Sequence, residues 1–173
     1  DHYNLTGSNL TDQPVALLNT AYYGRWSMNT INGIAPAPRV GQCSVYDPVT
    51  DSLVLAYGLG KDGEYLNDCW ALRLDPLEWR QIRTECLSPR EYPSAVLSGR
   101  CMFIYGGACN NQFFSDLHCI NLDTGELTII QVSGRIPCPR TSPAMFSHNH
   151  NIYMWAGFDG RSHGGIYYIN PQQ

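Results

Sequence analysis

The sequence lacks a long hydrophobic run. No stretch of about eighteen apolar residues occurs, which argues against a membrane-spanning helix. Charge is also sparse, because Asp, Glu, Lys and Arg together make up 15% of the residues and the formal net charge is −4. Without a basic excess to neutralise a phosphate backbone, we expect no nucleic-acid partner. The lack of a long apolar run leads us to expect no insertion into a membrane.

The seven cysteines show no metal-binding or redox pattern. No CxxC pair occurs among them, and that spacing is typical of zinc sites and redox dithiols. Most lie in apolar stretches, where a free Cys behaves as a small hydrophobic residue. We therefore expect no metal, no cofactor and a reducing, cytoplasmic location. Two glycosylation sequons, at Asn4 and Asn9, point weakly the other way.

A helical pattern is absent as well. No stretch keeps a helical hydrophobic period over about ten residues. Hydrophobic residues make up 43% of the chain, which is enough for a folded core, and 16 Gly and 11 Pro supply many turns. These features favour an all-β fold.

What the sequence does contain is a repeat of about fifty residues. A Pro-Arg pair ends at Arg39, Arg90 and Arg140, and an apolar run ends at Gly58, Gly107 and Gly157. An Asp follows in the first two units, at positions 68 and 116, where the third has Gly165. Several markers kept in phase through three units indicate a repeat architecture.

Each repeat is expected to form four short strands. In the second unit these are 93–97, 101–105, 117–122 and 127–132, all rich in β-branched, aromatic and Leu residues and bounded by turn residues. A four-stranded sheet of this size cannot bury both of its faces alone. Radial stacking as propeller blades buries them and shields most strand edges.

The markers resemble those of Kelch repeats over about residues 36 to 170. They are the Pro-Arg start, the pair Gly106-Gly107, the following Asp, the aromatic residues Tyr65 and Trp70, and the late Trp79. The resemblance implies an all-β, Kelch-type β-propeller, here partial, with about three four-stranded antiparallel blades. Tyr57 and Ala156 stand where the first Gly of the pair is expected, and Leu127 stands where the late Trp is expected.

We expect four segments along the chain. Residues 1–30 would end a preceding blade, with its third strand at 15–19 and its fourth at 25–28. Residues 31–84 and 85–133 would each form a Kelch blade, and 134–173 a blade that lacks its fourth strand. About three blades cannot close a ring, since propellers have about four to eight. Either a longer sequence holds the rest, or a second chain completes the ring.

Antiparallel topology places the loops between blades and the loops between second and third strands on one face. Binding residues are commonly loop residues on a rigid scaffold, so we expect partner binding there. The candidates are Lys61, Asp62, Tyr65, Asn110, Asn111, Phe113, Phe114, Asp159, Arg161 and His163. The alternative for the aromatic members is that they pack on their own blades.

Arg39, Arg90 and Arg140 allow two interpretations. They could form a basic collar for an acidic peptide, because Arg binds carboxylates in a bidentate manner. Alternatively each bonds backbone carbonyls or the Asp68 and Asp116 carboxylates. Repetition in every unit favours the structural role.

The resemblance implies a non-catalytic protein–protein interaction module, such as an adaptor or scaffold. We identify no catalytic residues. The alternative is a propeller enzyme of the galactose-oxidase kind, which needs two Tyr and two His as copper ligands, and no spacing here supports such a site. His148 and His150 share a turn without a third ligand nearby in the sequence, so we expect that turn to be solvated.

Overall fold

The computed structural model describes residues 23–31, 33–85 and 88–172, and the chain divides into two compact units, 1–30 and 31–173. In the first unit, residues 23–30 form no regular secondary structure, and Trp26 is 99% exposed. The strand expected over 25–28 is therefore not observed, since a strand requires a hydrogen-bonded neighbour. The strand expected over 15–19 lies outside the described residues.

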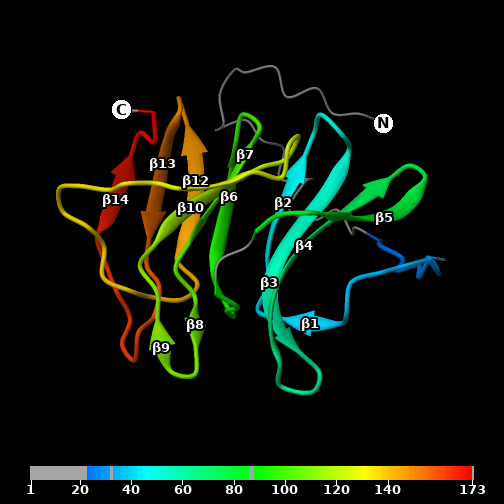
Figure 1. Cartoon of the computed structure of the whole chain (residues 1–173), viewed down its shortest axis with the longest axis horizontal. Coiled ribbons are helices and arrows are strands. Elements are labelled where there is room, and N and C mark those ends of the chain that lie inside the picture. Colours follow the sequence, from blue (N-terminus) through cyan, green and yellow to red (C-terminus); the bar gives the residue numbers. More distant parts are fainter. Residues whose placement is uncertain (1–22, 32, 86–87, 173) are drawn as a thin grey trace. The chain divides into compact units, whose positions relative to one another are not determined.

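The second unit is built from three antiparallel meander sheets (Figure 1). The first contains β2 (Cys43–Asp47), β3 (Ser52–Gly60), β4 (Tyr65–Leu74) and β5 (Leu77–Ile82), with the short β1 (Arg39–Val40) on the far end of β3. The second contains β6 (Ser94–Ser98), β7 (Cys101–Tyr105), β10 (Leu117–Asn121) and β11 (Leu127–Ile129). The third contains β12 (Ala144–His148), β13 (Asn151–Trp155) and β14 (Ile166–Ile169). A small hairpin, β8 (Ala108–Cys109) with β9 (Gln112–Phe113), projects from the second sheet.

The expected all-β architecture is confirmed. All four strands expected in the second repeat form. The first is shifted by one residue, the third ends at Asn121 instead of at residue 122, and the fourth ends at Ile129 instead of at residue 132. The part of the chain that the structure describes contains no candidate membrane-spanning helix.

Two hydrophobic cores lie between the sheets, and β7 contributes to both. Met102 and Ile104 pack with residues of the first sheet, such as Val54. Phe103 and Tyr105 pack in the other core, which includes Ile152 of the third sheet. Because side chains alternate along a strand, the middle blade buries both of its faces.

The outer face of the third sheet is open to solvent. Trp155 is 54% exposed and Tyr168 is 72% exposed. In the first two sheets a fourth strand pairs with the third, whereas β14 pairs with β13 alone among the described strands. An apolar face and an open edge of this kind are what a propeller blade presents to the strand and blade that follow it.

The backbone passes through the left-handed region directly after β7 and β13, and at the register shift near the end of β3. The φ angles are 63° at Tyr57, 71° at Gly106 and 65° at Ala156. A residue with a Cβ can adopt this conformation at an energetic cost. Tyr57 and Ala156 therefore replace the expected glycine without changing the path of the chain.

At the end of the blades that carries the β6–β7 turn, Arg100 joins the first two sheets. Its guanidinium contacts both carboxylate oxygens of the buried Asp47, at 2.6 and 3.0 Å, and also bonds Asp123 at 2.8 Å. The hydrogen bonds from Arg100 lower the pKa of Asp47 to about 2. This ion pair fixes the end of the blades opposite to the candidate site.

Candidate functional site

Three loops of the second unit lie at the same end of the blades (Figure 1). They are the β3–β4 turn, the β8–β9 hairpin and the loop between β13 and β14. Of the predicted binding residues, Lys61, Asp62, Asn110, Asn111 and Arg161 are exposed, whereas Tyr65, Phe113, Phe114, Asp159 and His163 are partly buried. The predicted loops thus lie together, and half of the predicted binding residues have exposed side chains while the other half are partly buried.

Local hydrogen bonds define the loop conformations. Asn110 and Asn111 have φ angles of 49° and 64°, as a two-residue hairpin of type I′ requires. The N–H of Asn110 donates to the hydroxyl of Tyr65 at 3.1 Å, which links the loops of two neighbouring blades. In the β3–β4 turn, the Asp62 N–H donates to Glu64 Oε2 at 3.0 Å. The exposed side chains therefore project from a well-defined scaffold.

One of the predicted aromatic anchors packs on its own blade. The ring of Phe114 stacks over the guanidinium of Arg90, with 4.1 Å between the guanidinium carbon and the ring centroid. Such a cation–π contact stabilises a buried arginine. Phe114 therefore offers less free surface to a partner than its place in the loop implies.

The three repeated arginines are bonded within the scaffold. Arg39 exposes 4% of its side chain, and Arg90 and Arg140 are 2% and 1% exposed. In each case Nε donates to the carbonyl two residues earlier, and Nη1 donates to the carbonyl of the residue with the left-handed φ: Tyr57, Gly106 or Ala156. Burial leaves these guanidinium groups little surface with which to form an open basic collar.

The third arginine differs from the other two. Arg39 is paired with Asp68, and Arg90 with Asp116, but Arg140 has no carboxylate within ion-pair distance among the described residues. Its Nη2 instead donates to Cys138 Sγ at 3.2 Å. Cys138 also lies beside Asp159 and His163, and these three could together hold a metal ion. The sequence predicts Asp159 and His163 as partner-binding residues and not as metal ligands. Cys138, which lies 21 residues before Asp159, is not among the predicted site residues.

Comparison with known families agrees with this geometry. The profile described as "KLHDC2/KLHL20/DRC7 Kelch-repeats domain" matches residues 4–173. The chain belongs to the Kelch-repeat family. Its three meander sheets are consecutive blades of a partial Kelch propeller, as the repeat markers predict.

Several larger proteins contain a region similar to this Kelch chain. Acyl-CoA-binding domain-containing protein 4 of Arabidopsis thaliana is 31% identical over 140 residues, which cover 79% of this chain and 21% of that protein. Host cell factor 2 of Homo sapiens is 27% identical, over 78% of this chain and 20% of that protein. The Rab9 effector protein with kelch motifs of Bos taurus is 31% identical, over 67% and 33%. The chain thus spans about a fifth of the length of the first two.

A buried polar network joins the first two Kelch blades beneath the candidate face. His118 Nδ1 lies 2.8 Å from Asp116 Oδ2, and His118 Nε2 lies 2.8 Å from the Tyr57 hydroxyl. Because a carboxylate only accepts hydrogen bonds, Nδ1 carries the proton and Nε2 accepts from Tyr57. Burial lowers the pKa of His118 below its usual value, although Asp116 opposes the shift. Burial alone would raise the pKa of Asp116, but hydrogen bonds from His118 and Arg90 outweigh it and lower that pKa.

Acidification is expected to weaken this Kelch fold through His118. Its pKa is lower in the folded chain than the ordinary value of about 6.5, so the unfolded chain takes up the proton first as the pH falls. The free energy of unfolding should therefore decrease below about pH 6.5, by at most about 1.4 kcal/mol per pH unit from this one group. Urea titrations at several pH values would measure the slope. A His118→Gln variant should show a shallower slope, and an equal slope would contradict the assignment.

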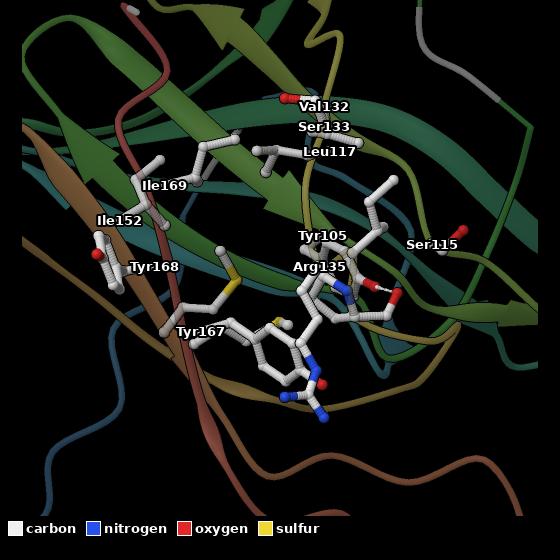
Figure 2. A pocket seen from close by; sticks show the side chains of 14 residues that line it. Tyr105, Ser115, Leu117, Val132, Ser133, Arg135, Ile152, Tyr167, Tyr168 and Ile169 are labelled. Carbon is white, nitrogen blue, oxygen red and sulfur yellow. Dashed lines mark hydrogen bonds between the residues drawn. The ribbon is translucent and has the colours of Figure 1, made fainter.

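An apolar cavity of about 100 Å³ lies between the second and third Kelch blades (Figure 2). Tyr105 and Leu117 line it from the second blade, and Ile152 and Tyr167 line it from the third. The Tyr105 hydroxyl donates to the Pro137 carbonyl at 3.0 Å, next to this cavity. The cavity is a gap in the packing between these two blades and is separate from the exposed loop residues of the candidate site.

Proposed function

We propose that this Kelch chain is a non-catalytic protein–protein interaction module that binds a partner peptide or subunit at the loop end of its blades. The observation that carries the proposal is that Lys61, Asn111 and Arg161 are exposed on three loops of three successive blades. Loops held on a rigid scaffold lose little backbone freedom when their exposed polar groups bind a partner. A relative whose name describes it as a Rab9 effector is in keeping with this role.

The alternative, a propeller oxidase, is less well supported. Its ligands would be two Tyr and two His that converge on an accessible copper ion. Among the described residues, the hydrogen-bonded Tyr–His pair is Tyr57 with His118, and both side chains are fully buried. This pair lies in the packing between two blades, where a substrate has no access.

The proposal extends to the cellular role. An adaptor or scaffold in the cytoplasm, with protein partners and neither nucleic acid nor membrane as a target, fits the exposed loops and the small negative charge. Of the cysteines that the structure describes, Cys101, Cys109, Cys119 and Cys138 are free thiols, as is usual in a reducing compartment.

Cross-linking offers a direct test, because Lys61 is the only lysine of this sequence. The protein that contains this chain, isolated with its partners from its own source, would be treated with an amine-reactive cross-linker and analysed by mass spectrometry. We expect partner peptides attached to Lys61. Complexes without any cross-link at Lys61 would place the partner elsewhere.

A pair of matched variants gives a second measurement. Lys61→Glu with Arg161→Glu reverses two exposed charges on the loop end, and we expect at least a tenfold weaker affinity for the partner recovered with the wild type, about 1.4 kcal/mol. Val49→Glu with His148→Glu changes two exposed residues at the opposite end and should leave affinity unchanged. Equal loss in both variants, or loss in neither, would contradict docking on the loop end.

A further inference from the structure

We propose that Cys138, Asp159 and His163 form a binding site for a divalent transition-metal ion, best suited to zinc, at the loop end of the third blade. A thiolate, an imidazole and a carboxylate are the three side-chain ligand types of zinc. This inference goes beyond the proposed function, and its test requires no partner.

The distances from Cys138 to the other two groups fit tetrahedral coordination. Cys138 Sγ lies 3.6 Å from His163 Nε2 and 4.0 Å from Asp159 Oδ2. Metal bonds of about 2.3 Å to sulfur and about 2.0 Å to nitrogen, at a tetrahedral angle, separate the two ligand atoms by about 3.5 Å. Small side-chain movements would therefore be enough to bring all three groups onto one ion.

One carboxylate oxygen of Asp159 is buried within the cluster. Asp159 Oδ1 is inaccessible to solvent and has no hydrogen-bond partner, although His163 Nε2 is only 2.8 Å away. His163 lowers the pKa of Asp159, so the two side chains interact directly, although the two atoms lack the alignment of a full hydrogen bond. Buried polar atoms in folded proteins are nearly always satisfied, and a metal ion held between these groups would satisfy this one.

The contacts of Arg140 also support a metal ligand at Cys138. Its guanidinium is buried without a carboxylate partner among the described residues, and Nη2 donates to Cys138 Sγ at 3.2 Å. Arg140 also donates to two carbonyl oxygens and lies over the Tyr167 ring, but a buried guanidinium without an anion is costly. The sulfur of Cys138, once it ligates a metal ion, would supply the negative charge beside it. Hydrogen bonds from outer groups to metal ligands also hold the ligands in place. In the first two blades an Asp pairs with the corresponding arginine. The third blade lacks this Asp, and it is the blade that carries the cluster of Cys138, Asp159 and His163.

The backbone around the cluster holds its ligands in position. Thr141 pairs with Phe158 across the start of the blade, which brings Cys138 close to the 156–165 loop. Within that loop, the His163 N–H donates to the Gly157 carbonyl at 3.1 Å. Three protein ligands leave a fourth position open to water or to a group from a partner.

A nucleophilic Cys–His–Asp triad fits these atoms less well. In such a triad the sulfur and the carboxylate contact opposite nitrogens of the ring. Here Asp159 contacts Nε2, and Sγ is nearly equidistant from the two nitrogens, at 3.6 Å from Nε2 and 3.8 Å from Nδ1. We therefore favour a shared metal ion over a proton relay.

The test is binding of Zn²⁺ and Co²⁺ to the protein that contains this chain. We expect one Zn²⁺ per chain at this site, and with Co²⁺ the visible spectrum of a tetrahedral ion with a sulfur-to-metal charge-transfer band. Removal of groups that only support metal ligands costs about 10- to 100-fold in affinity. Cys138→Ser and His163→Gln should therefore each weaken Zn²⁺ binding by at least about 100-fold.

Matched controls separate the site from general thiol or imidazole binding. Cys109→Ser removes another partly exposed thiol at the same end, and His148→Gln removes an exposed imidazole at the other end, so both should bind Zn²⁺ as the wild type does. Zn²⁺ should also protect Cys138, and not Cys109, from alkylation by iodoacetamide. Thermal unfolding without metal would show that each variant folds. Failure of the wild type to bind Zn²⁺, wild-type affinity in Cys138→Ser, or alkylation of Cys138 that Zn²⁺ does not slow would each overturn the proposal.

Discussion

Replacement of Arg90 by methionine is expected to lower the free energy of unfolding by about 3–5 kcal/mol, the usual cost of removing one partner from a buried ion pair. Arg90 donates to Asp116 at 2.7 Å and to the Gly106 carbonyl at 3.0 Å. Its guanidinium also stacks on Phe114. Methionine keeps the apolar stem but leaves Asp116 paired only with His118. Urea unfolding at neutral pH would measure the change.

Arg161→Met is the matched control for this substitution. The Arg161 side chain is 82% exposed and reaches Asp159 only at 3.9 Å, so its loss should change stability by less than about 0.5 kcal/mol. If the two variants were equally stable, Arg90 would not hold the blade together in the way that its contacts indicate.

Gly106→Ala is expected to destabilise the fold by more than about 3 kcal/mol. The glycine has a φ of 71°, and an added Cβ would collide with the backbone carbonyl oxygen of Arg140 at the entrance to the next blade. The left-handed conformation alone costs a residue with a Cβ about 1–2 kcal/mol. The collision adds to this cost, because the Gly107 N–H donates to the same carbonyl at 3.0 Å and keeps it in place.

Gly134→Ala separates the two contributions. Gly134 has a similar φ of 79°, and nothing lies within 4 Å of an added Cβ there. We expect the free energy of unfolding of this variant to fall only by the cost of the left-handed conformation, about 1 kcal/mol. Thermal and urea unfolding of both variants would measure the difference, and equal losses would show that the contact between the blades tolerates a methyl group.

The architecture could be read from the sequence because its signals are local and repeated. The strands of the second blade follow from apolar runs bounded by turn residues, and three of them begin at Cys101, Leu117 and Leu127 as expected. The Arg markers at 39, 90 and 140 set the period. In contrast, the strand expected over 25–28 is not observed, since apolar residues alone provide no pairing partner.

The candidate site was only partly predictable, since it depends on contacts between segments far apart in the sequence. Loop positions identify Asp159 and His163, but Cys138 approaches them through the pairing of Thr141 with Phe158. Likewise, Phe114 stands in an exposed loop of the sequence, but stacks on Arg90. One signal was available in advance: the third repeat has Cys138 before its Pro-Arg pair and no Asp at position 165.

The alternation along β7 has a consequence for how such a chain can change over evolutionary time. Met102 and Ile104 must fit the blade before, and Phe103 and Tyr105 the blade after. A duplicated repeat can therefore be inserted only where one face of its sheet packs against the preceding blade and the other face packs against the following blade. The unit that evolution must conserve is thus the interface between two blades. Neighbouring residues of one strand are constrained by different interfaces.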